Sequence, residues 1–271
     1  MHVLEPDKDR DEWFVIDPSG MSFSRCVPDK CSSRKILPIA GAKKRVFSSV
    51  RAVINLAIRE HGLSVTNVFS GTFIPDDEIK KKRLPIPAPD LAKIQQECMA
   101  MDDEPRWLIA LISDTGMRLS EACGLQACDI HLDGDTPYIN LVEHPWRRLK
   151  TDSSSRQVPL VGASLWAAQR IKDAGSTFTF PKYCRDAKCN PNSASAVTNK
   201  WMKPRVQDGC VIHSFRHSLR DRLRAIECPA DIIDAIGGWT TKGIGHQYGK
   251  GHGFTIMHGR MERLTTKVQE P

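Results

Sequence analysis

The sequence predicts a mainly α-helical fold with a small antiparallel β-sheet, an α+β class in which a partial helical domain precedes a larger domain. In several segments after residue 43, apolar residues recur at the three- and four-residue spacing of amphipathic helices. Two short segments, Tyr-Ile-Asn-Leu-Val at 138–142 and Arg-Gln-Val-Pro-Leu at 156–160, are typical of strands joined through a turn region. A chain of 271 residues has enough material for one large domain or two smaller ones.

The N-terminal third divides into three segments. Residues 1–42 show no sustained period and contain scattered prolines, which predicts an irregular or disordered segment. The spacing over 44–60 predicts an amphipathic helix that ends at His61-Gly62. One such helix cannot form a core alone, so we expect 43–78 to be a partial helical domain. A basic, proline-rich linker is expected at 79–89.

The rest of the chain, 90–271, is expected to be the larger domain. Asp90 is a plausible N-cap for a helix that runs to Met101. A second apolar helix covers 106–113, Thr115-Gly116 breaks it, and helical spacing resumes over 119–125. Further helices are predicted near 163–173, 193–202, 214–226, 229–236 and 255–268.

Composition narrows the class of partner and the compartment. The formal net charge is +7 and the pI about 9.0, which favours a polyanionic partner. No apolar run reaches the roughly 18 residues of a membrane span. The first ten residues lack the cationic start and apolar core of a secretory signal, so we expect a cytoplasmic protein.

Nine cysteines raise the question of metal or disulfides. Three pairs have four intervening residues each, namely Cys26/Cys31, Cys123/Cys128 and Cys184/Cys189. Cys123 and Cys128 fall where a helix ends and are expected to be small buried apolar residues. Cys184/Cys189 is the better zinc candidate, but it lacks the second tight pair of most zinc sites. We expect no metal, and free thiols in a cytoplasmic chain with an odd number of cysteines.

Six hydrogen-bonding residues indicate chemistry at a phosphate: Arg118, Lys150, His213, Arg216, Trp239 and Tyr248. Forked guanidinium groups fit phosphate oxygens, and the set as a whole does not suit a metal. Glu121, three residues after Arg118, is placed to hold that arginine. A tyrosine beside such a cradle is a candidate nucleophile on phosphorus. Each residue alone has an ordinary interpretation, such as a solvated ion pair or a core aromatic; together they favour one site.

The order and spacing of these residues resemble a known family. Residues 85–264 resemble the catalytic domain of the tyrosine recombinases, the phage-integrase family. The resemblance rests on Thr-Gly-Met-Arg-Leu-Ser-Glu-Ala at 115–122, Lys-Thr-Asp-Ser-Ser-Ser-Arg-Gln-Val-Pro-Leu at 150–160 and His-Ser-Phe-Arg-His at 213–217. Ile-Gly-Gly-Trp at 236–239 and a tyrosine nine residues later complete it. Many members carry histidine where Trp239 stands, but the indole N–H can donate similarly.

The resemblance implies a role for each residue. Tyr248 would attack the scissile phosphate to form a 3′-phosphotyrosine and free a 5′-hydroxyl, without metal or cofactor. Arg118 and Arg216 would hold the non-bridging oxygens, and Glu121 would support Arg118. Lys150 would protonate the departing 5′-oxygen, His213 would assist proton transfer at the tyrosine, and Trp239 would donate to a phosphate oxygen.

The resemblance also implies double-stranded DNA as the partner and four protomers on two duplexes. The helix at 44–60 resembles the last helix of the core-binding domain in such proteins. A complete core-binding domain has four helices, so this region is shortened. The C-terminal helix, through Phe254, Ile256, Met257, Met261 and Leu264, would dock on a neighbouring protomer or fold back onto its own core. Candidate DNA-binding residues are Lys44, Arg45, Arg51, Lys80, Lys81, Lys82 and Arg83.

Three functions remain open at this stage. The first is site-specific DNA integration or excision. The second is DNA binding without catalysis, by an inactive remnant of an integrase, which the thin N-terminal region favours. The third is a type IB topoisomerase, which shares the nucleophile and the cradle, although the Val-Pro-Leu and Ile-Gly-Gly-Trp segments fit integrases better.

Overall fold

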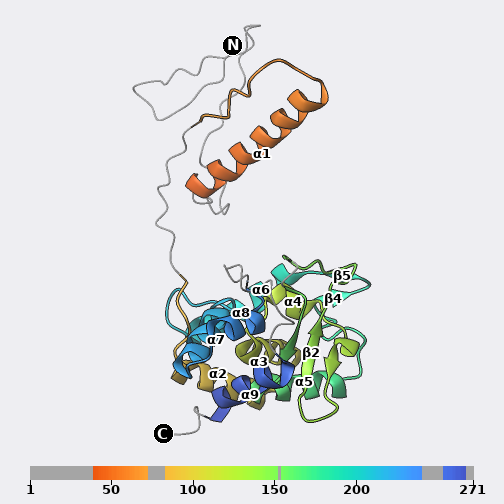
Figure 1. The fold of residues 1–271 in the computed structure, drawn as a ribbon, viewed down its shortest axis with the longest axis vertical. Coiled ribbons are helices and arrows are strands. Elements are labelled where there is room, and N and C mark those ends of the chain that lie inside the picture. The colour runs from red at the N-terminus through yellow and green to blue at the C-terminus, as the bar shows by residue number, and fades with distance from the viewer. Residues whose placement is uncertain (1–38, 73–82, 152–153, 240–252, 267–271) are drawn as a thin grey trace, which may run out of the picture. The chain divides into compact units, whose positions relative to one another are not determined.

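The computed structural model describes residues 39–72, 83–151, 154–239 and 253–266. The chain divides into two compact units, Met1–Lys80 and Lys81–Pro271. Figure 1 shows a long helix in the first unit, and helices gathered around a small sheet in the second. The architecture confirms the expected mainly α fold with a small antiparallel sheet.

The first unit is built on α1 (Ile39–Glu60), which begins five residues before the predicted start at 44. Asn67 folds the following segment back, since its Nδ2 donates to the main-chain oxygen of Arg51 at 3.0 Å. Apolar side chains on this helix nevertheless remain exposed, with Val53 65% exposed. The assignment of 43–78 to a partial core-binding domain stays a prediction. Lys44 and Arg45 lie in α1, and their side chains are outside the described part of the chain.

The larger unit is organised around α3 (Glu104–Thr115), whose residues from Leu108 to Thr115 are all buried. Asp103 caps this helix by accepting a hydrogen bond from the main-chain N–H of Arg106 at 3.1 Å. A helix segment that is buried on all sides must be surrounded by other elements. It packs against α2 (Ala88–Met101), α5 (Gly162–Asp173) and α7 (Ser214–Ala225).

Two local expectations were wrong. Asp90 lies inside the first turn of α2 and does not cap it, because the helix begins directly after Pro87. The helix expected over 119–125 is the shorter α4 (Leu119–Cys123). It ends at Gly124, after which the main chain of Gln126 pairs with that of Phe178.

The sheet has the strand order β1-β2-β3, with β1 at Ile130–His131, β2 at Tyr138–Leu141 and β3 at Arg156–Pro159. Both pairings are antiparallel, and Leu141 faces Arg156 across β2 and β3. The sequence predicted β2 and β3 but not β1. Lys150 lies in the loop between β2 and β3, as expected.

The Cys184/Cys189 pair forms a disulfide that closes a hairpin of β4 (Cys184–Arg185) and β5 (Lys188–Cys189). The expectation of free thiols was therefore wrong for this pair, because the hairpin brings the two sulfurs together. Cys123 is buried, as predicted, but Cys128 is exposed. Cys26 and Cys31 lie outside the described residues.

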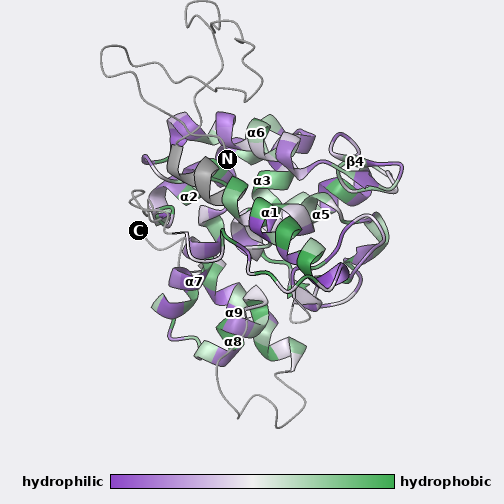
Figure 2. Cartoon of the chain, turned by 90° about the horizontal axis from the view of Figure 1, so that it is seen from above, coloured by the Kyte–Doolittle hydropathy of each residue, from purple (hydrophilic) through white to green (hydrophobic). Residues whose placement is uncertain are grey.

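Three further helices complete this unit: α6 (Pro191–Met202), α8 (Ala230–Gly237) and α9 (Phe254–Thr266). Figure 2 shows apolar and polar residues alternating along α8 and α9, as expected for helices that each bury one face. Met261 and Leu264 of α9 are buried in a cluster with Leu219 and Leu223 of α7. The C-terminal helix thus folds back onto its own chain, while Ile256 stays exposed. Among the described helices, none combines the length and apolar character needed to cross a bilayer.

Candidate active site

Arg118 stands immediately before α4 and is fixed by Glu121, which is 2% exposed. Nη1 of Arg118 donates to Oε1 of Glu121 and, at 2.9 Å, to Oγ of Ser154. The main-chain N–H of Arg118 donates to Oε2 of the same carboxylate at 2.9 Å. Burial acts to raise the pKa of Glu121, but Arg156 and the hydrogen bonds from Arg118 outweigh it, so this pKa lies below its ordinary value. Glu121 and Arg118 are therefore in direct contact, while the role of this contact in catalysis stays a prediction.

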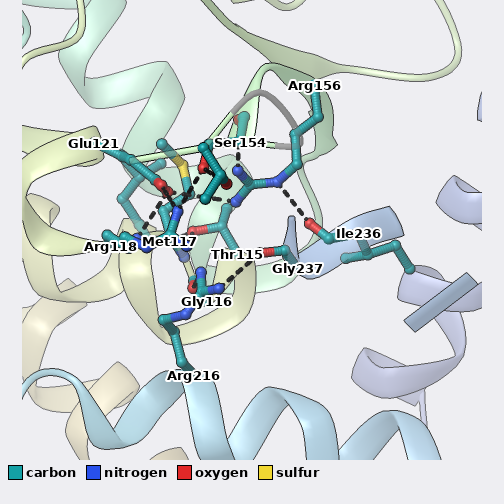
Figure 3. A network of polar contacts seen from close by, with 12 residues as sticks. Thr115, Gly116, Met117, Arg118, Glu121, Ser154, Arg156, Arg216, Ile236 and Gly237 are labelled. Atoms are coloured by element: carbon teal, nitrogen blue, oxygen red, sulfur yellow. Dashed lines mark hydrogen bonds and ion pairs between the residues drawn. The ribbon is translucent and has the colours of Figure 1, made fainter. Parts of the chain in front are cut away.

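Arg216, on α7, joins two segments that are far apart in the sequence (Figure 3). Its Nη1 donates to the main-chain oxygen of Gly116 at 2.7 Å, and its Nη2 donates to that of Gly237 at 2.8 Å. The residue is only 4% exposed, and burial is the main cause that lowers its pKa to about 10. Arg216 stays charged at neutral pH, because this value is well above 7. The guanidinium therefore fixes the loop before Arg118 to the end of α8.

Trp239 follows α8 and lies against two arginines. The Cζ atoms of Arg216 and Arg220 are 4.6 and 4.9 Å from the centre of its ring. A Cβ on Gly237 would come within 1.8 Å of the same ring, so only glycine leaves the space. The indole thus contacts Arg216 through its face, a favourable cation–π geometry.

His213 stands directly before α7 and is half-buried. Burial lowers its pKa to about 4, and the charges of Arg83, Arg216, His217 and Arg118 act in the same direction. The imidazole is consequently neutral at pH 7 and able to accept a proton. The same effects show that His213 shares one electropositive environment with both arginines of the predicted cradle.

Lys150 is exposed in the loop between β2 and β3. The next residue, Thr151, places Oγ1 at 2.9 Å from Oγ of Ser154, which in turn contacts Arg118. Hydroxyl groups thus tether the lysine-bearing loop beside the first arginine. Tyr248 lies outside the described residues, as do Lys80, Lys81 and Lys82. Arg83 is exposed, and Arg51 belongs to the first unit.

Arg156 is a site residue that sequence reasoning did not single out. Its Nε donates to the main-chain oxygen of Ile236 at 2.9 Å, its Nη1 donates to that of Ser154 at 2.9 Å, and its Nη2 lies 3.4 Å from Oε2 of Glu121. The side chain is buried, and Figure 3 shows it reaching between Ser154 and Ile236. The only sequence signal was a charged residue at the start of a strand that ends in apolar residues.

The arrangement can bind a phosphodiester. Arg216 uses two of its five N–H groups on carbonyl oxygens, and Arg118 uses Nη1 alone for its side-chain contacts. Among the described residues, the other N–H groups of these two side chains have no partner. A single buried carboxylate, that of Glu121, faces three arginine side chains, so the site keeps an excess of positive charge suited to an anion.

Residues 88–250 match the model of the phage integrase family. The match spans more than half of the chain, and the chain belongs to this family. The resemblance inferred from the sequence is thereby confirmed: the larger unit contains a tyrosine recombinase catalytic domain, and the protein is a DNA recombinase that acts as a strand transferase.

Solved structures share the fold. A lambda integrase (75–356) dimer bound to a COC′ core site has a TM-score of 0.51 at 16% identity, over 77% of this chain and 72% of that one. The Tn1549 transposon integrase in complex with circular intermediate DNA has a TM-score of 0.50 at 20% identity, over 81% and 78% of the two chains. A lambda integrase tetramer bound to a Holliday junction has a TM-score of 0.52 at 17% identity, over 77% of this chain and 59% of that one. Comparison with curated proteins gives no match.

Proposed function

We propose that this recombinase integrates or excises DNA through a 3′-phosphotyrosine formed by Tyr248. One observation carries the proposal: buried Arg216 links the Gly116 loop, which precedes Arg118, to Gly237, which precedes Trp239. This link keeps Arg118 and Arg216 close together, as is needed if both arginines bind the same phosphate. The family match, which extends to residue 250, includes Tyr248.

In the proposed step, the phenolic oxygen of Tyr248 attacks phosphorus and the bond from phosphorus to the 5′-oxygen breaks. The departing 5′-oxygen takes a proton from Lys150. Arg118 and Arg216 hold the non-bridging oxygens and stabilise the charge that grows on them in the transition state. The phosphodiester energy is kept in the covalent link, so a second 5′-hydroxyl reverses the step without a nucleotide cofactor.

His213 assists proton transfer at the tyrosine in this scheme, since its pKa of about 4 leaves the imidazole neutral at pH 7, with one ring nitrogen able to accept a hydrogen bond. Trp239 donates its indole N–H to a phosphate oxygen while its ring rests on Arg216. Glu121 holds Arg118 in place. All of these steps use the chain's own side chains.

The proposed substrate is double-stranded DNA in the cytoplasm, bound by four protomers. Complexes with a core site, circular intermediate DNA and a Holliday junction are recorded for lambda and Tn1549 integrases. Exposed Ile256 on α9 offers a contact to a neighbouring protomer, even though Met261 and Leu264 pack on their own core. The proposed DNA contacts outside the cradle are Lys44, Arg45, Arg51, Lys80, Lys81, Lys82 and Arg83.

A nicked suicide substrate tests the nucleophile. After cleavage, the short fragment that carries the free 5′-hydroxyl diffuses away, so the reverse reaction is prevented and the covalent adduct is trapped. Wild-type protein should form the adduct, and Tyr248→Phe should form none. Tyr138→Phe is the matched control, since Tyr138 lies in β2 and stacks on His131. An adduct that survives in Tyr248→Phe would move the nucleophile elsewhere.

A second candidate is DNA binding without catalysis. Exposed apolar side chains on α1, Val53 among them, favour it because a complete core-binding domain would cover them. Wild-type protein that binds the same DNA but forms no adduct would support this candidate. Relaxation of supercoiled DNA without an attachment site would instead indicate a topoisomerase.

A further inference from the structure

Arg147 is a buried arginine in the loop that carries Lys150. It is 4% exposed, so its guanidinium is directed into the protein. Nη1 donates to the main-chain oxygen of Glu121 at 2.8 Å, and Nη2 donates to that of Val142. The side chain therefore connects the end of β2 to helix α4. Glu121, whose carboxylate holds Arg118, uses its carbonyl to hold Arg147.

The space for this side chain exists because residue 124 is glycine. A Cβ on Gly124 would lie 2.6 Å from Cδ and 2.9 Å from Cβ of Arg147. The methylene groups of Arg147 thus cross directly over the backbone at the end of α4. The adjacent Trp146 donates its indole N–H to the main-chain oxygen of the same Gly124 at 3.1 Å.

A second anchor holds the start of the loop. Nε2 of His144 lies 2.9 Å from Oδ2 of Asp129, and the ring of His144 stacks on that of Trp146 with centroids 4.7 Å apart. The main-chain N–H groups of His144 and Arg147 each donate to the carbonyl of the other residue, at 3.1 and 2.9 Å. The turn at 144–147 is therefore closed on itself and fixed to the core.

Burying a guanidinium is costly, and burial is the main cause that lowers the pKa of Arg147. Among the described residues, its buried Nε has no hydrogen-bond partner. An apolar side chain would fill the same space without this cost. What an apolar side chain lacks is two directional hydrogen bonds that join α4 to the loop.

We propose that Arg147 is a positioning residue that sets the place of Lys150 relative to Arg118. Lys150 follows Arg147 by three residues, and the segment between them includes Leu149, which packs on the core. Arg147 fixes the loop on one side of the lysine, and the Thr151–Ser154 contact fixes it on the other. The inference rests on the proposed function, in which Lys150 protonates the departing 5′-oxygen.

A change of leaving group separates positioning of the proton donor from general damage. When sulfur replaces the bridging 5′-oxygen at the scissile phosphate, the bond from phosphorus to sulfur breaks and a thiolate departs. A thiol has a much lower pKa than an alcohol, so a thiolate can depart without receiving a proton, whereas an alkoxide cannot. Loss of a general acid therefore slows cleavage of the oxygen substrate and largely spares the sulfur substrate.

The experiment compares single-turnover cleavage of the two substrates by full-length wild type, Lys150→Ala, Arg147→Gln and Arg148→Gln. Arg148 is the matched control, since it is the neighbouring arginine and its side chain is 93% exposed. Loss of a general acid costs about 100-fold or more. We expect Lys150→Ala and Arg147→Gln to cleave the oxygen substrate at least about tenfold more slowly than wild type does. On the sulfur substrate, both variants should cleave at close to the wild-type rate. Arg148→Gln should keep the wild-type ratio of sulfur to oxygen rates.

The outcomes separate the two proposals. If Lys150→Ala does not recover on sulfur, the role of Lys150 fails, and the inference about Arg147 fails with it. Suppose that Lys150→Ala recovers on the sulfur substrate, but Arg147→Gln cleaves the oxygen and sulfur substrates more slowly by the same factor. Arg147 is then merely structural, and only the inference about Arg147 is overturned. Should Arg147→Gln not fold, Gly124→Ala decides, because its methyl group displaces the Arg147 side chain. Gly124→Ala should show the same selective loss on oxygen, and equal losses on both substrates would overturn the inference.

Discussion

Nε of Arg156 donates a hydrogen bond to the main-chain oxygen of Ile236 at 2.9 Å, across 80 positions of sequence. This bond joins strand β3 to the end of α8, directly before Gly237 and Trp239. The same guanidinium reaches Glu121, so one buried side chain connects α4, which follows Arg118, to the end of α8, which precedes Trp239. Arg216 reaches the same end of α8 through its own bond to Gly237. The cradle thus depends on a residue that need not touch DNA.

Replacing Arg156 by methionine should destabilise the protein strongly. The change leaves Glu121 buried with less compensating charge and removes the donors to Ile236 and Ser154. Breaking a buried ion pair by removing one partner costs about 3–5 kcal/mol. Urea unfolding measures the loss. Arg224→Met is the control, since that side chain is 60% exposed, and equal losses for the two variants would contradict the prediction.

Two glycines with similar backbone angles should respond differently to alanine. Gly238 and Gly175 have φ of +62° and +66°. Among the described residues, nothing lies within 4 Å of a Cβ on Gly175, so Gly175→Ala should cost only the conformational strain of about 1–2 kcal/mol. A Cβ on Gly238 would lie 2.7 Å from Nη1 of Arg156, which its hydrogen bonds prevent from moving away. Gly238→Ala should therefore lower the thermal midpoint further than Gly175→Ala, and equal shifts would reject this.

The lowered pKa of His213 predicts a dependence of stability on pH. Its value is about 4 in the folded protein, against about 6.5 for an ordinary histidine. Between these values the unfolded chain binds more protons than the folded one, so stability falls as the pH drops from about 6.5 toward 4. His213→Gln should make the free energy of unfolding less dependent on pH in this window. Urea titrations across it provide the measurement, and identical slopes for both proteins would contradict the prediction.

Lysine at position 118 or 216 should impair cleavage far more than binding. Lysine keeps the charge but replaces the guanidinium fork by a single ammonium, which cannot reach both Gly116 and Gly237 as Arg216 does. Loss of one transition-state donor costs about 100- to 1,000-fold in rate. Gel-shift affinity should change only a few-fold, because many other contacts to phosphates remain. Equal falls in binding and cleavage would make the arginines ordinary positioning contacts.

Local patterns were sufficient for most of the elements. The helices predicted near 163–173, 193–202, 214–226 and 229–236 correspond to α5, α6, α7 and α8 within a few residues. Apolar spacing carries this information because a helix must bury one face. The strands that the sequence did not predict were missed for another reason. Strand β1 and the hairpin of β4 and β5 contain only two residues per strand, too few for a periodic signal.

By itself, the sequence determined membership of the phage integrase family, and it was enough to predict which residues form the phosphate site, since that prediction needs only side-chain chemistry and spacing. It also determined that Glu121 would hold Arg118, because the two residues are neighbours along one helix turn. Only the tertiary structure decided that Arg216 is bonded to Gly116 and Gly237, and that Trp239 lies on Arg216. It alone decided that Arg147 and Arg156, which resemble ordinary surface charges in the sequence, are buried. These contacts join segments that are distant in the sequence and are brought together only by packing. Packing decides which hydrogen-bonding groups are buried, and each buried group then needs a partner.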